Sequence, residues 1–520
     1  MDSNTEIVLE TEDVTAVEVG DSVAAGDASA RALPFSFAKR HGVLIREIKD
    51  GKADTVYRTG ASPLSLAEAR RFAGVPLQLT RVPAEAFDAM LQQAYEQGSN
   101  MAMQMVGGLD EDIDLLQVAQ ELPEPSDLLE SDDDAPIIRF INAVLTEAVK
   151  ENASDVHIEP YENRLVVRFR IDGVLREILQ TRRALAPLVV SRIKVMSKLD
   201  IAEKRLPQDG RIKMRLSKNR AIDFRVSTCP TLFGEKVVLR ILDPASAKIG
   251  IDALGYEDRQ KALFQKHLDK PYGMILVTGP TGSGKTVSLY TGLNILNEEY
   301  RNISTAEDPV EINLVGINQV NVNPKVGLTF ASAMRAFLRQ DPDVIMVGEI
   351  RDLETAEIAI KAAQTGHLVL STLHTNDAPS TLTRLVDMGT KPYAIATSVS
   401  LIIAQRLARR LCENCKEVKD VPREALEKEG FGAEDFDGDL TIFGPVGCKS
   451  CNDGYKGRVG IFQVMEVSET MGRIIMESGN AIQIADQAEV EGVIDLRRAG
   501  LNKVKEGLTG LEEINRVTID

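Results

Sequence analysis

The sequence contains no long hydrophobic run, and no segment of it approaches the roughly 18–20 consecutive apolar residues of a membrane-spanning helix. Its first 30 residues hold eight acids and no Lys or Arg, so the basic start of a secretory signal peptide is also missing. Together these absences predict a soluble protein that is made and kept in the cytosol.

Positive charge is scarce relative to negative charge. The 520 residues include 61 Lys and Arg against 78 Asp and Glu, which gives a net charge of −17 at pH 7. Such a chain repels a phosphate backbone, and its aromatic residues are not interleaved with basic ones as they are in proteins that bind single strands. The composition therefore disfavours a nucleic-acid helicase or packaging motor.

Cysteine is rare, but four of the five cysteines form two C-x-x-C pairs. In a reducing cytosol disulfides are disfavoured, whereas two such pairs supply four thiolates for one Zn²⁺. A redox role is less favoured, because no thioredoxin-like pattern surrounds the pairs. The 32 residues between the pairs predict a small insertion over residues 412–451, while the lone Cys229 is predicted to be buried. The predicted zinc ligands are Cys412, Cys415, Cys448 and Cys451.

Length and shifts in composition predict several domains, since 520 residues exceed what one hydrophobic core organises. Residues 1–32 read as a disordered acidic tail, and residues 33–105 mix strand and helix patterns, as in a small α+β domain. Residues 106–135 are predicted to be a linker, because residues 121–135 carry seven acids, two prolines and no base. The sequence shows no internal repeat.

Residues 136–245 predict a second small α+β domain. An amphipathic helix is expected over residues 137–150, followed by two strands, residues 165–171 and 174–178, that are joined by an Asp-Gly turn. Arginines project from these strands at alternate positions. From there on, residues 246–520 alternate strands with helices, which is typical of an α/β nucleotide-binding core that includes the cysteine insertion.

A complete phosphate loop is the strongest single motif. Residues 279–286 read G-P-T-G-S-G-K-T, preceded by the apolar run 274–277 and followed by a predicted helix. A glycine-rich turn between a strand and a helix points backbone N–H groups at a polyphosphate, with Lys285 reaching the β/γ-phosphates and Thr286 holding Mg²⁺. The predicted phosphate-binding residues are Gly279, Pro280, Thr281, Gly282, Ser283, Gly284, Lys285 and Thr286.

Acidic residues follow two further apolar runs. Residues 303–311 form a strand that ends at Pro309 and presents Glu307, Asp308 and Glu311, one of which could orient or deprotonate the attacking water. Taken alone, such carboxylates are usually solvated or cap a helix.

Glu349 ends the hydrophobic strand 343–349, in the Walker B position that holds Mg²⁺ or its water. Gly348 stands where many P-loop enzymes have Asp, so direct ligation of the metal is left open. The strand 368–372 is flanked by His367 and His374, each of which alone would usually be structural. All these motifs fall in order within about a hundred residues, which favours one common site.

These motifs resemble those of a known family. Residues 279–286, 307–311, 341–352 and 365–376 look like the Walker A, Asp box, Walker B and His box of the secretion ATPases of the type II/type IV pilus superfamily. Residues 154–159 and 205–211 resemble the family's second N-terminal domain, and residues 457–461 resemble a segment near the end of its chain. Residues 33–44 resemble the first N-terminal domain of the type II secretion ATPases, the GspE group.

The resemblance implies a RecA-like P-loop core behind a PAS-like, arginine-bearing second N-terminal domain, with each ATP site between the two. It implies Glu311 as general base, Glu349 at Mg²⁺ and His374 as a sensor of phosphate. Arg211 and Arg225 match candidates for γ-phosphate contacts, although surface ion pairing is the alternative. The implied cofactors are ATP, Mg²⁺ and Zn²⁺.

The resemblance also implies a homo-hexamer that is held at the inner membrane by partner proteins, without nucleic acid. Residues 33–105 would bind a GspL-type cytoplasmic domain, and a GspF-type platform protein is a second partner. The predicted function is ATP hydrolysis that drives protein export through a type II secretion system by pseudopilus assembly. Assembly of type IV pili is the alternative, and a silent scaffold is disfavoured by the intact Lys285, Glu311 and Glu349.

Overall fold

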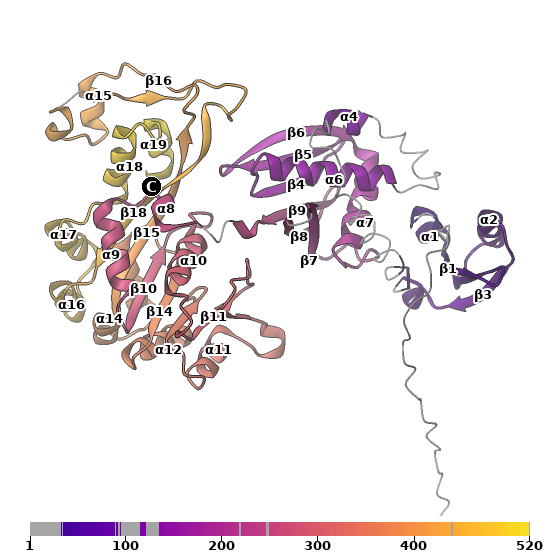
Figure 1. Ribbon diagram of the computed structural model, residues 1–520, viewed down its shortest axis with the longest axis horizontal. Coiled ribbons are helices and arrows are strands. Elements are labelled where there is room, and N and C mark those ends of the chain that lie inside the picture. The colour runs from indigo at the N-terminus through magenta and orange to yellow at the C-terminus, as the bar shows by residue number, and fades with distance from the viewer. Residues whose placement is uncertain are drawn as a thin grey trace, which may run out of the picture. The chain divides into compact units, whose positions relative to one another are not determined.

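The computed structural model describes residues 33, 35–88, 90, 91, 94, 115–120, 135–217, 220–245, 249–437 and 440–518 (Figure 1). The described residues up to 94 form one compact unit, and those from 115 onward form a second. Within these ranges, no helix combines the length and the hydrophobicity that a bilayer crossing requires. The predicted tail, residues 1–32, and most of the predicted linker, residues 106–135, lie outside the described residues.

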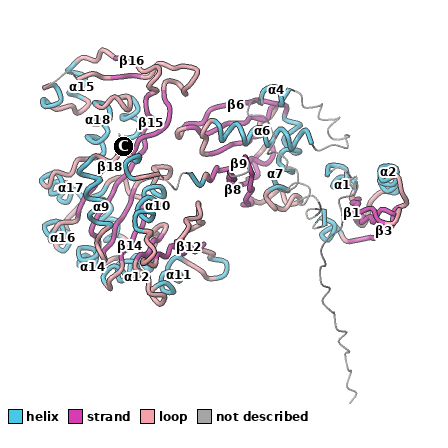
Figure 2. Tube along the Cα trace, in the orientation of Figure 1, coloured by secondary structure: helices cyan, strands magenta, loops and turns pink. Residues whose placement is uncertain are grey.

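The first unit is a small three-stranded sheet with helices (Figure 2). Its antiparallel hairpin turns at Asp50 and Gly51, both with positive φ, and the third strand runs parallel to the second after a helical crossover. Val43, Ile45 and Ala53 form the core with Ala69 and Leu33, so this unit has a hydrophobic core of its own. In chain order its elements are α1 (Phe35–His41), β1 (Val43–Lys49), β2 (Lys52–Arg58), α2 (Pro63–Ala73) and β3 (Leu77–Val82).

The second unit begins with a six-stranded antiparallel sheet in the order β6-β5-β4-β9-β8-β7. Val156 and Ile158 of β4 point to the apolar side, so the alternating Asp155, His157 and Glu159 lie on the opposite, charged face. The elements are α4 (Leu115–Gln120), α6 (Ala135–Lys150), β4 (Asp155–Pro160), β5 (Arg164–Ile171), β6 (Val174–Arg182), α7 (Ala186–Met196), β7 (Gln208–Ser217), β8 (Arg220–Thr231) and β9 (Gly234–Leu242).

Two details of this domain bear on the sequence predictions. The Asp172-Gly173 turn between β5 and β6 is present, and both residues have positive φ as a tight hairpin requires. The segment predicted to be a linker contains the helix α4, which packs on α6 and buries Leu115 and Val118. The acids that favoured a linker lie in residues 121–135, whereas residues 115–120 are uncharged, and two apolar residues three positions apart hold this helix against α6.

A seven-stranded sheet in the order β12-β11-β13-β14-β10-β15-β18 forms the nucleotide-binding core. All neighbours are parallel except β15 and β18, and β10, β13 and β14 are buried at every residue because helices cover both faces. The strands are β10 (Gly273–Thr278), β11 (Ile303–Glu307), β12 (Asn318–Asn321), β13 (Val344–Val347), β14 (Leu368–Leu373), β15 (Val399–Leu411) and β18 (Tyr455–Glu466).

Helices flank this sheet and continue beyond it to the C-terminus. In chain order they are α8 (Ile251–Leu254), α9 (Asp258–Leu268), α10 (Lys285–Leu296), α11 (Phe330–Phe337), α12 (Leu353–Gln364), α13 (Ala378–Asp387), α14 (Pro392–Ser398), α16 (Glu469–Met476), α17 (Ala481–Val490), α18 (Leu496–Lys505) and α19 (Leu511–Thr518). Since parallel strands end at one edge, the segments after β10, β11, β13 and β14 meet there.

The segment between the two cysteine pairs leaves the sheet at the end of β15 and returns at β18. It contains β16 (Glu417–Val418), α15 (Arg423–Lys428) and β17 (Phe443–Gly444). Leu426, Phe431 and Ile442 join the core of the ATPase sheet. Asp435, whose side chain has no exposed surface, pairs with Arg498 and Lys505 of α18 at 2.5 Å each. The insertion is therefore anchored to the core at its middle as well as at its cysteines.

Candidate nucleotide-binding site

The phosphate loop connects β10 to α10 and lies against β15. Gly279, Gly282 and Gly284 all have positive φ. A Cβ atom at Gly279 would lie 2.4 Å from the carbonyl oxygen of Gln405, and one at Gly284 would lie 2.8 Å from its Nε2. Glycine is required at both positions because β15 passes so close. This packing fixes the loop with the N-terminus of α10 open to a phosphate.

Lys285 is the first residue of α10 and turns back over the loop. Its Nζ donates to the carbonyl oxygens of Gly279 at 2.7 Å and Pro280 at 3.1 Å. Burial lowers the pKa of Lys285 to about 8, against the opposing effect of Glu349. A bound polyphosphate would offer this ammonium anionic partners in place of carbonyl dipoles, which strengthens the charged form.

A cavity of about 680 Å³ opens beside the loop, large enough for a nucleotide. Thr286, Glu311, Glu349 and His374 all line it, so the predicted phosphate loop, acidic box, Walker B and His box meet at one place. Residues of the second N-terminal domain form another wall, namely Ser154, Asp155, Arg170, Gly173 and Arg240.

Glu307 and Glu311 differ in their surroundings. Glu307 ends β11 and accepts hydrogen bonds from Tyr290 Oη at 2.5 Å, Thr305 Oγ1 at 2.6 Å and Gln319 Nε2 at 3.1 Å. These three bonds occupy its oxygens and leave them less accessible to an attacking water. Desolvation raises the pKa of Glu311, with Arg240 and Arg225 opposing the rise and Glu307 adding to it. A raised pKa brings this carboxylate closer to the range of a general base.

Glu349 stands just after β13 between Arg351 and His374. Its Oε1 pairs with Arg351 Nη2 at 2.5 Å, and its Oε2 lies 3.5 Å from Nε2 of His374. Thr372 Oγ1 of β14 donates to the carbonyl oxygen of Gly348 at 2.7 Å, which fixes the backbone beside Glu349. The Walker B and His box residues are thus in contact, while Arg351 was not among the residues that the sequence singled out.

The arginines of the second N-terminal domain form a row across its sheet. In strand register, Arg211 of β7 faces Arg225 of β8, which faces Arg240 of β9; Arg240 faces Asp155 of β4, which faces Arg170 of β5. Cross-strand partners share one face of a sheet, so these five side chains form one charged row. Sequence reasoning named two of its arginines and missed Arg240 and Arg170, although alternation along β9 and β5 places them on the same face.

Within this row the arginines have different partners. Arg211 Nη2 donates to the carbonyl oxygen of Val310 at 3.1 Å, beside Glu311 in the acidic box. Arg225 and Arg240 act electrostatically on Glu311. The cavity wall contains Arg240 and Arg170 but neither Arg211 nor Arg225. The two arginines chosen from the sequence therefore lie near the acidic box and do not line the cavity. Arg225 is the neighbour of Arg240 in the row, and Arg211 is one strand further away.

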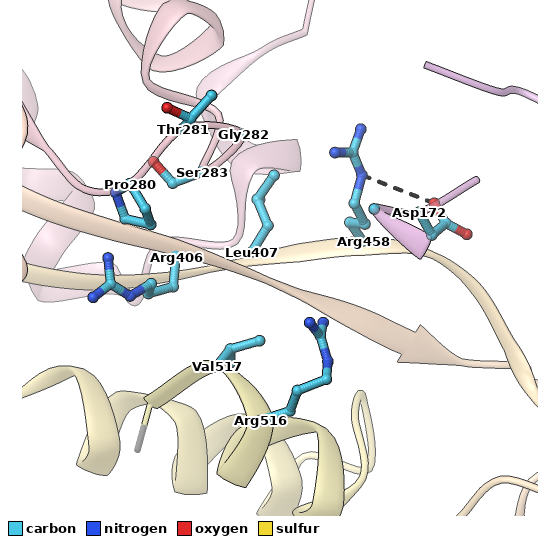
Figure 3. A pocket seen from close by; sticks show the side chains of 11 residues that line it. Asp172, Pro280, Thr281, Gly282, Ser283, Arg406, Leu407, Arg458, Arg516 and Val517 are labelled. Atoms are coloured by element: carbon cyan, nitrogen blue, oxygen red, sulfur yellow. Dashed lines mark ion pairs between the residues drawn. The ribbon is translucent and has the colours of Figure 1, made fainter. Parts of the chain in front are cut away.

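A second cavity of about 350 Å³ adjoins the outer side of the phosphate loop (Figure 3). Arg406 and Leu407 of β15, Arg458 of β18 and Arg516 of α19 line it. The β5–β6 turn closes one side, where Asp172 Oδ2 accepts from Gly457 N at 2.8 Å and Oδ1 lies 3.8 Å from Arg458 Nε. Three guanidinium groups and an apolar side chain beside the phosphate loop suit the base and ribose of a nucleotide.

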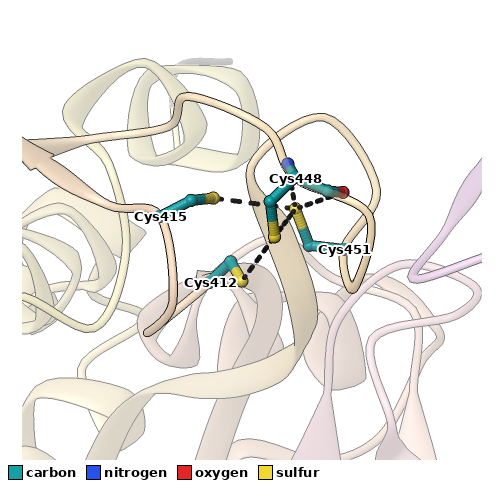
Figure 4. Close-up of side chains that lie close together, drawn as sticks. All are labelled: Cys412, Cys415, Cys448 and Cys451. Atoms are coloured by element: carbon teal, nitrogen blue, oxygen red, sulfur yellow. Dashed lines mark hydrogen bonds between the residues drawn. The ribbon is translucent and has the colours of Figure 1, made fainter.

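The four predicted zinc ligands form one cluster (Figure 4). Their sulfur atoms lie within 4.8 Å of one another, with 3.9 Å between Cys412 and Cys448, 3.7 Å between Cys415 and Cys451, and 3.6 Å between Cys448 and Cys451. Four sulfurs at about 2.3 Å from a tetrahedral Zn²⁺ lie about 3.8 Å apart, so this donor set fits zinc.

The cysteines differ in their surroundings, and one prediction about them was wrong. Hydrogen bonds from Ser450 lower the pKa of Cys448 to about 6, whereas desolvation raises the pKa of Cys415 to about 11. The prediction that Cys229 is buried was wrong, because Cys229 is exposed. Alternation along β8 points Thr228 to the core and Cys229 outward, opposite Lys236.

A phosphate loop at the carboxyl edge of a mostly parallel sheet, with acids at the ends of the neighbouring strands, defines a RecA-like P-loop ATPase. Residues 130–516 match the profile of the family described as "Type II/IV secretion system protein", and the chain belongs to this family. Residues 32–95 also match a domain model for the N-terminal part of "GSPII protein E".

Named relatives fall into two groups. The type IV pilus assembly ATPase PilB of Acinetobacter baylyi is 66% identical over 74% of this chain and 67% of its own length. The type II secretion system protein E of Dickeya dadantii is 49% identical over 94% of this chain and 97% of its own length. The crystal structure of the pilus retraction motor PilT with bound ADP has a TM-score of 0.50 at 27% identity and covers 73% of this chain and 97% of its own.

These findings confirm the predicted family, the fold class and the enzyme class. The protein is a secretion ATPase that hydrolyses ATP, and its family uses ATP with Mg²⁺. Its four clustered cysteines are compatible with zinc.

Proposed function

We propose that the protein is the ATPase of a type II secretion system and that it drives export by pseudopilus assembly. The N-terminal domain carries this proposal, because residues 32–95 match the N-terminal domain model of protein E. Relatives named as type II secretion proteins align over 94–95% of the chain, whereas the two PilB relatives align over 74–75%.

Assembly of type IV pili is the second candidate. The specific observation in its favour is identity, since the aligned part is 64–66% identical to PilB against 49% for protein E of Dickeya dadantii. A motor domain is shared between the two systems, while the N-terminal domain meets the partner, so we give the N-terminal match more weight.

A deletion strain separates the two candidates. Loss of the gene should stop the release of exported proteins into the medium and leave surface pili and twitching motility intact. Complementation by the full chain, but not by a chain that lacks residues 33–105, should restore release. Loss of pili with normal protein release would establish the pilus role instead.

In the proposed site, residues 279–286 bind the phosphates of ATP, with Lys285 at the β/γ-phosphates. Thr286 and Glu349 would hold Mg²⁺, which supplies charge neutralisation at the β- and γ-oxygens. Glu311 takes the proton of the attacking water, and His374 responds to the γ-phosphate through its contact with Glu349. The adjoining cavity at Arg406, Arg458 and Arg516 receives the base and ribose.

In this proposal the arginine row couples ATP hydrolysis to movement of the second N-terminal domain relative to the ATPase core. Arg225 and Arg240 would approach the γ-phosphate as the cavity closes, and Arg211 would carry the movement to the acidic box through Val310. Within a homo-hexamer each closure changes the angle between domains, and the ring passes that motion to membrane components.

Partners and metal complete the proposal. The first unit would bind a GspL-type cytoplasmic domain, a GspF-type platform protein would be a further contact, and these would hold the cytoplasmic ATPase at the inner membrane. The four cysteines would hold one structural Zn²⁺. A pull-down with residues 31–105 as bait should recover the inner-membrane partner. The same experiment with the chain that lacks these residues should not recover it.

A further inference from the structure

Asp155 lies between Arg240 and Arg170 in the charged row described above. Its Oδ1 accepts from Arg240 Nε at 3.0 Å, and its Oδ2 lies 3.7 Å from Arg170 Nε. Ser154 Oγ donates to the same Oδ2 at 2.8 Å, which fixes the orientation of the carboxylate. Only 9% of the Asp155 side chain is exposed, while those of Arg240 and Arg170 are 51% and 35% exposed. The carboxylate is therefore buried at the sheet surface, and the more exposed guanidinium groups of Arg240 and Arg170 line the cavity beside it.

Charge balance in the row explains why such a carboxylate is needed. The row itself holds four arginines and one acid, Asp155, and like charges on adjacent strands repel one another. Asp155 supplies the counter-charge between Arg240 and Arg170, and Arg170 Nη1 also donates to the carbonyl oxygen of Gly173 at 2.9 Å. Asp155 holds both on the cavity wall, where they are ready for an anion.

We propose that Asp155 is a positioning residue for ATP hydrolysis. It holds Arg240 and Arg170 where they can contact the γ-phosphate, and its ion pairs with them weaken when ATP binds. This inference rests on the proposed function of the cavity as the ATP site. Asp155 lines the same cavity, so its negative charge also weakens the binding of ATP in the ground state. It thus favours turnover at the expense of affinity.

Further along the same strand, Glu159 supplies a matched control. It is equally buried, and it pairs with Arg168 at 2.6 Å and Lys236 at 2.7 Å on the same sheet face. Neither Glu159 nor these two partners lines the cavity. The variant Glu159→Gln therefore breaks a comparable ion-pair cluster without touching the nucleotide.

The test compares steady-state kinetics and thermal unfolding of the full chain carrying Asp155→Asn, Glu159→Gln, Arg240→Ala and the double change Asp155→Asn with Arg240→Ala. Asparagine keeps the shape and one acceptor of Asp155 but loses its charge. We expect Asp155→Asn to lower kcat about 10–10²-fold and to lower KM for ATP about two- to tenfold. Glu159→Gln should leave kcat and KM at wild-type values, even if it lowers Tm by as much as Asp155→Asn does.

The double variant distinguishes positioning from general damage. If Asp155 acts through Arg240 and Arg170, part of its effect is already absent once Arg240 is removed, so the double variant should lose less turnover than the product of the two single losses. Multiplicative losses, an unchanged or raised KM in Asp155→Asn, or an equal fall of kcat in Glu159→Gln would each overturn the inference. Full activity of Arg240→Ala would overturn it together with the proposed role of the arginine row, whereas an inactive Arg240→Ala beside a normal Asp155→Asn would overturn the positioning role alone.

Discussion

At the scale of single residues, Glu307 and Glu311 of the acidic box have unequal chemistry although both line the cavity. The oxygens of Glu307 accept hydrogen bonds from Tyr290, Thr305 and Gln319, whereas desolvation raises the pKa of Glu311. The assignment of the base to Glu311 thus has a physical reason that is independent of family resemblance.

Replacing Glu311 by Gln should leave ATP binding nearly intact and lower kcat by about 10²–10⁴-fold, because the amide cannot accept the proton. Single-turnover kinetics and binding of a fluorescent ATP analogue measure the two effects separately. Lys285→Ala is the contrasting variant, which should lose productive binding as well. Normal turnover of Glu311→Gln would place the base elsewhere.

The raised pKa of Glu311 also predicts the pH dependence. A base works only when deprotonated, so activity is present above its pKa and is lost as pH falls through it. Because desolvation raises this pKa above the ordinary 4.5, the acid limb of kcat/KM should lie at higher pH than for a free carboxyl. A pH–rate profile of the wild type shows this limb, and Glu311→Gln should lack it.

Residue-level predictability followed the strength of each motif. The phosphate loop was predictable at every position because strand, glycines and helix start agree. Arg240 and Arg170 were missed because their importance lies in register: a single sequence shows that arginines alternate, but only strand pairing shows that they flank Asp155. Arg351 was missed for a similar reason, since its ion pair with Glu349 depends on the conformation of the backbone that follows β13.

At the scale of elements, the cysteine insertion has two independent anchors. One is the cluster of four sulfurs, and the other is the core contact of Leu426, Phe431 and Ile442 with the ion pairs of Asp435. Although burial opposes it, hydrogen bonds from Arg498 and Lys505 hold the pKa of Asp435 well below its usual range. The sequence predicted the insertion but not this second anchor, because Asp435 and α18 are more than 60 residues apart.

The wild-type protein should contain about one equivalent of Zn²⁺ per chain by elemental analysis. Replacing Cys412 and Cys415 by Ser should remove it, because structural zinc contributes roughly 10–16 kcal/mol of apparent binding only through a complete ligand set. Limited proteolysis should then cut near residues 412–420 and 444–451, while the middle of the insertion stays protected. ATP should still bind, and secretion should fail. Zinc-free wild-type protein would contradict this account.

The complementary variant is Asp435→Asn. It should lower the free energy of unfolding by about 1–3 kcal/mol at pH 7, because two cations lose their carboxylate partner at a buried position. Zinc content should remain near one equivalent, since the sulfur cluster is untouched. Thermal unfolding and metal analysis of the same sample measure both. Loss of zinc in this variant would show that the two anchors are not independent.

At the scale of the whole molecule, the ATP site draws on two domains of the second unit. The ATPase core contributes the phosphate loop, and the second N-terminal domain contributes Arg240, Arg170 and the Asp172 turn. The order of these domains and their α+β character were predictable from composition and periodicity. The contacts between them were not, because residues such as Asp172 and Gly457 are 285 positions apart and each looks like an ordinary turn residue.

Arginine at the domain boundary should matter for turnover more than for affinity. Alanine at Arg225 should lower turnover on the order of 10³-fold with a small effect on nucleotide binding, because its contact with the γ-phosphate would form only on closure. Alanine at Arg211 should act in the same direction, because it removes the bond to Val310 beside Glu311. Total activity should rise more than linearly with protein concentration until rings form, so specific activity should increase over that range. Equal specific activity across a dilution series of verified monomer would contradict the need for a ring.

Strand β15 runs from the phosphate loop to the cysteine cluster as one continuous strand. Gln405 packs against Gly279 and Gly284 and accepts from Ser288, and the strand ends at Leu411, directly before Cys412. The path from Gln405 to Cys412 covers about 23 Å of extended backbone, stiffened by pairing with β18, whose register shifts once between Arg409 and Leu411. No loop interrupts the backbone between Gln405 and Leu411. We therefore expect a spectroscopic label on the cysteine segment to report movements of the phosphate loop during ATP turnover.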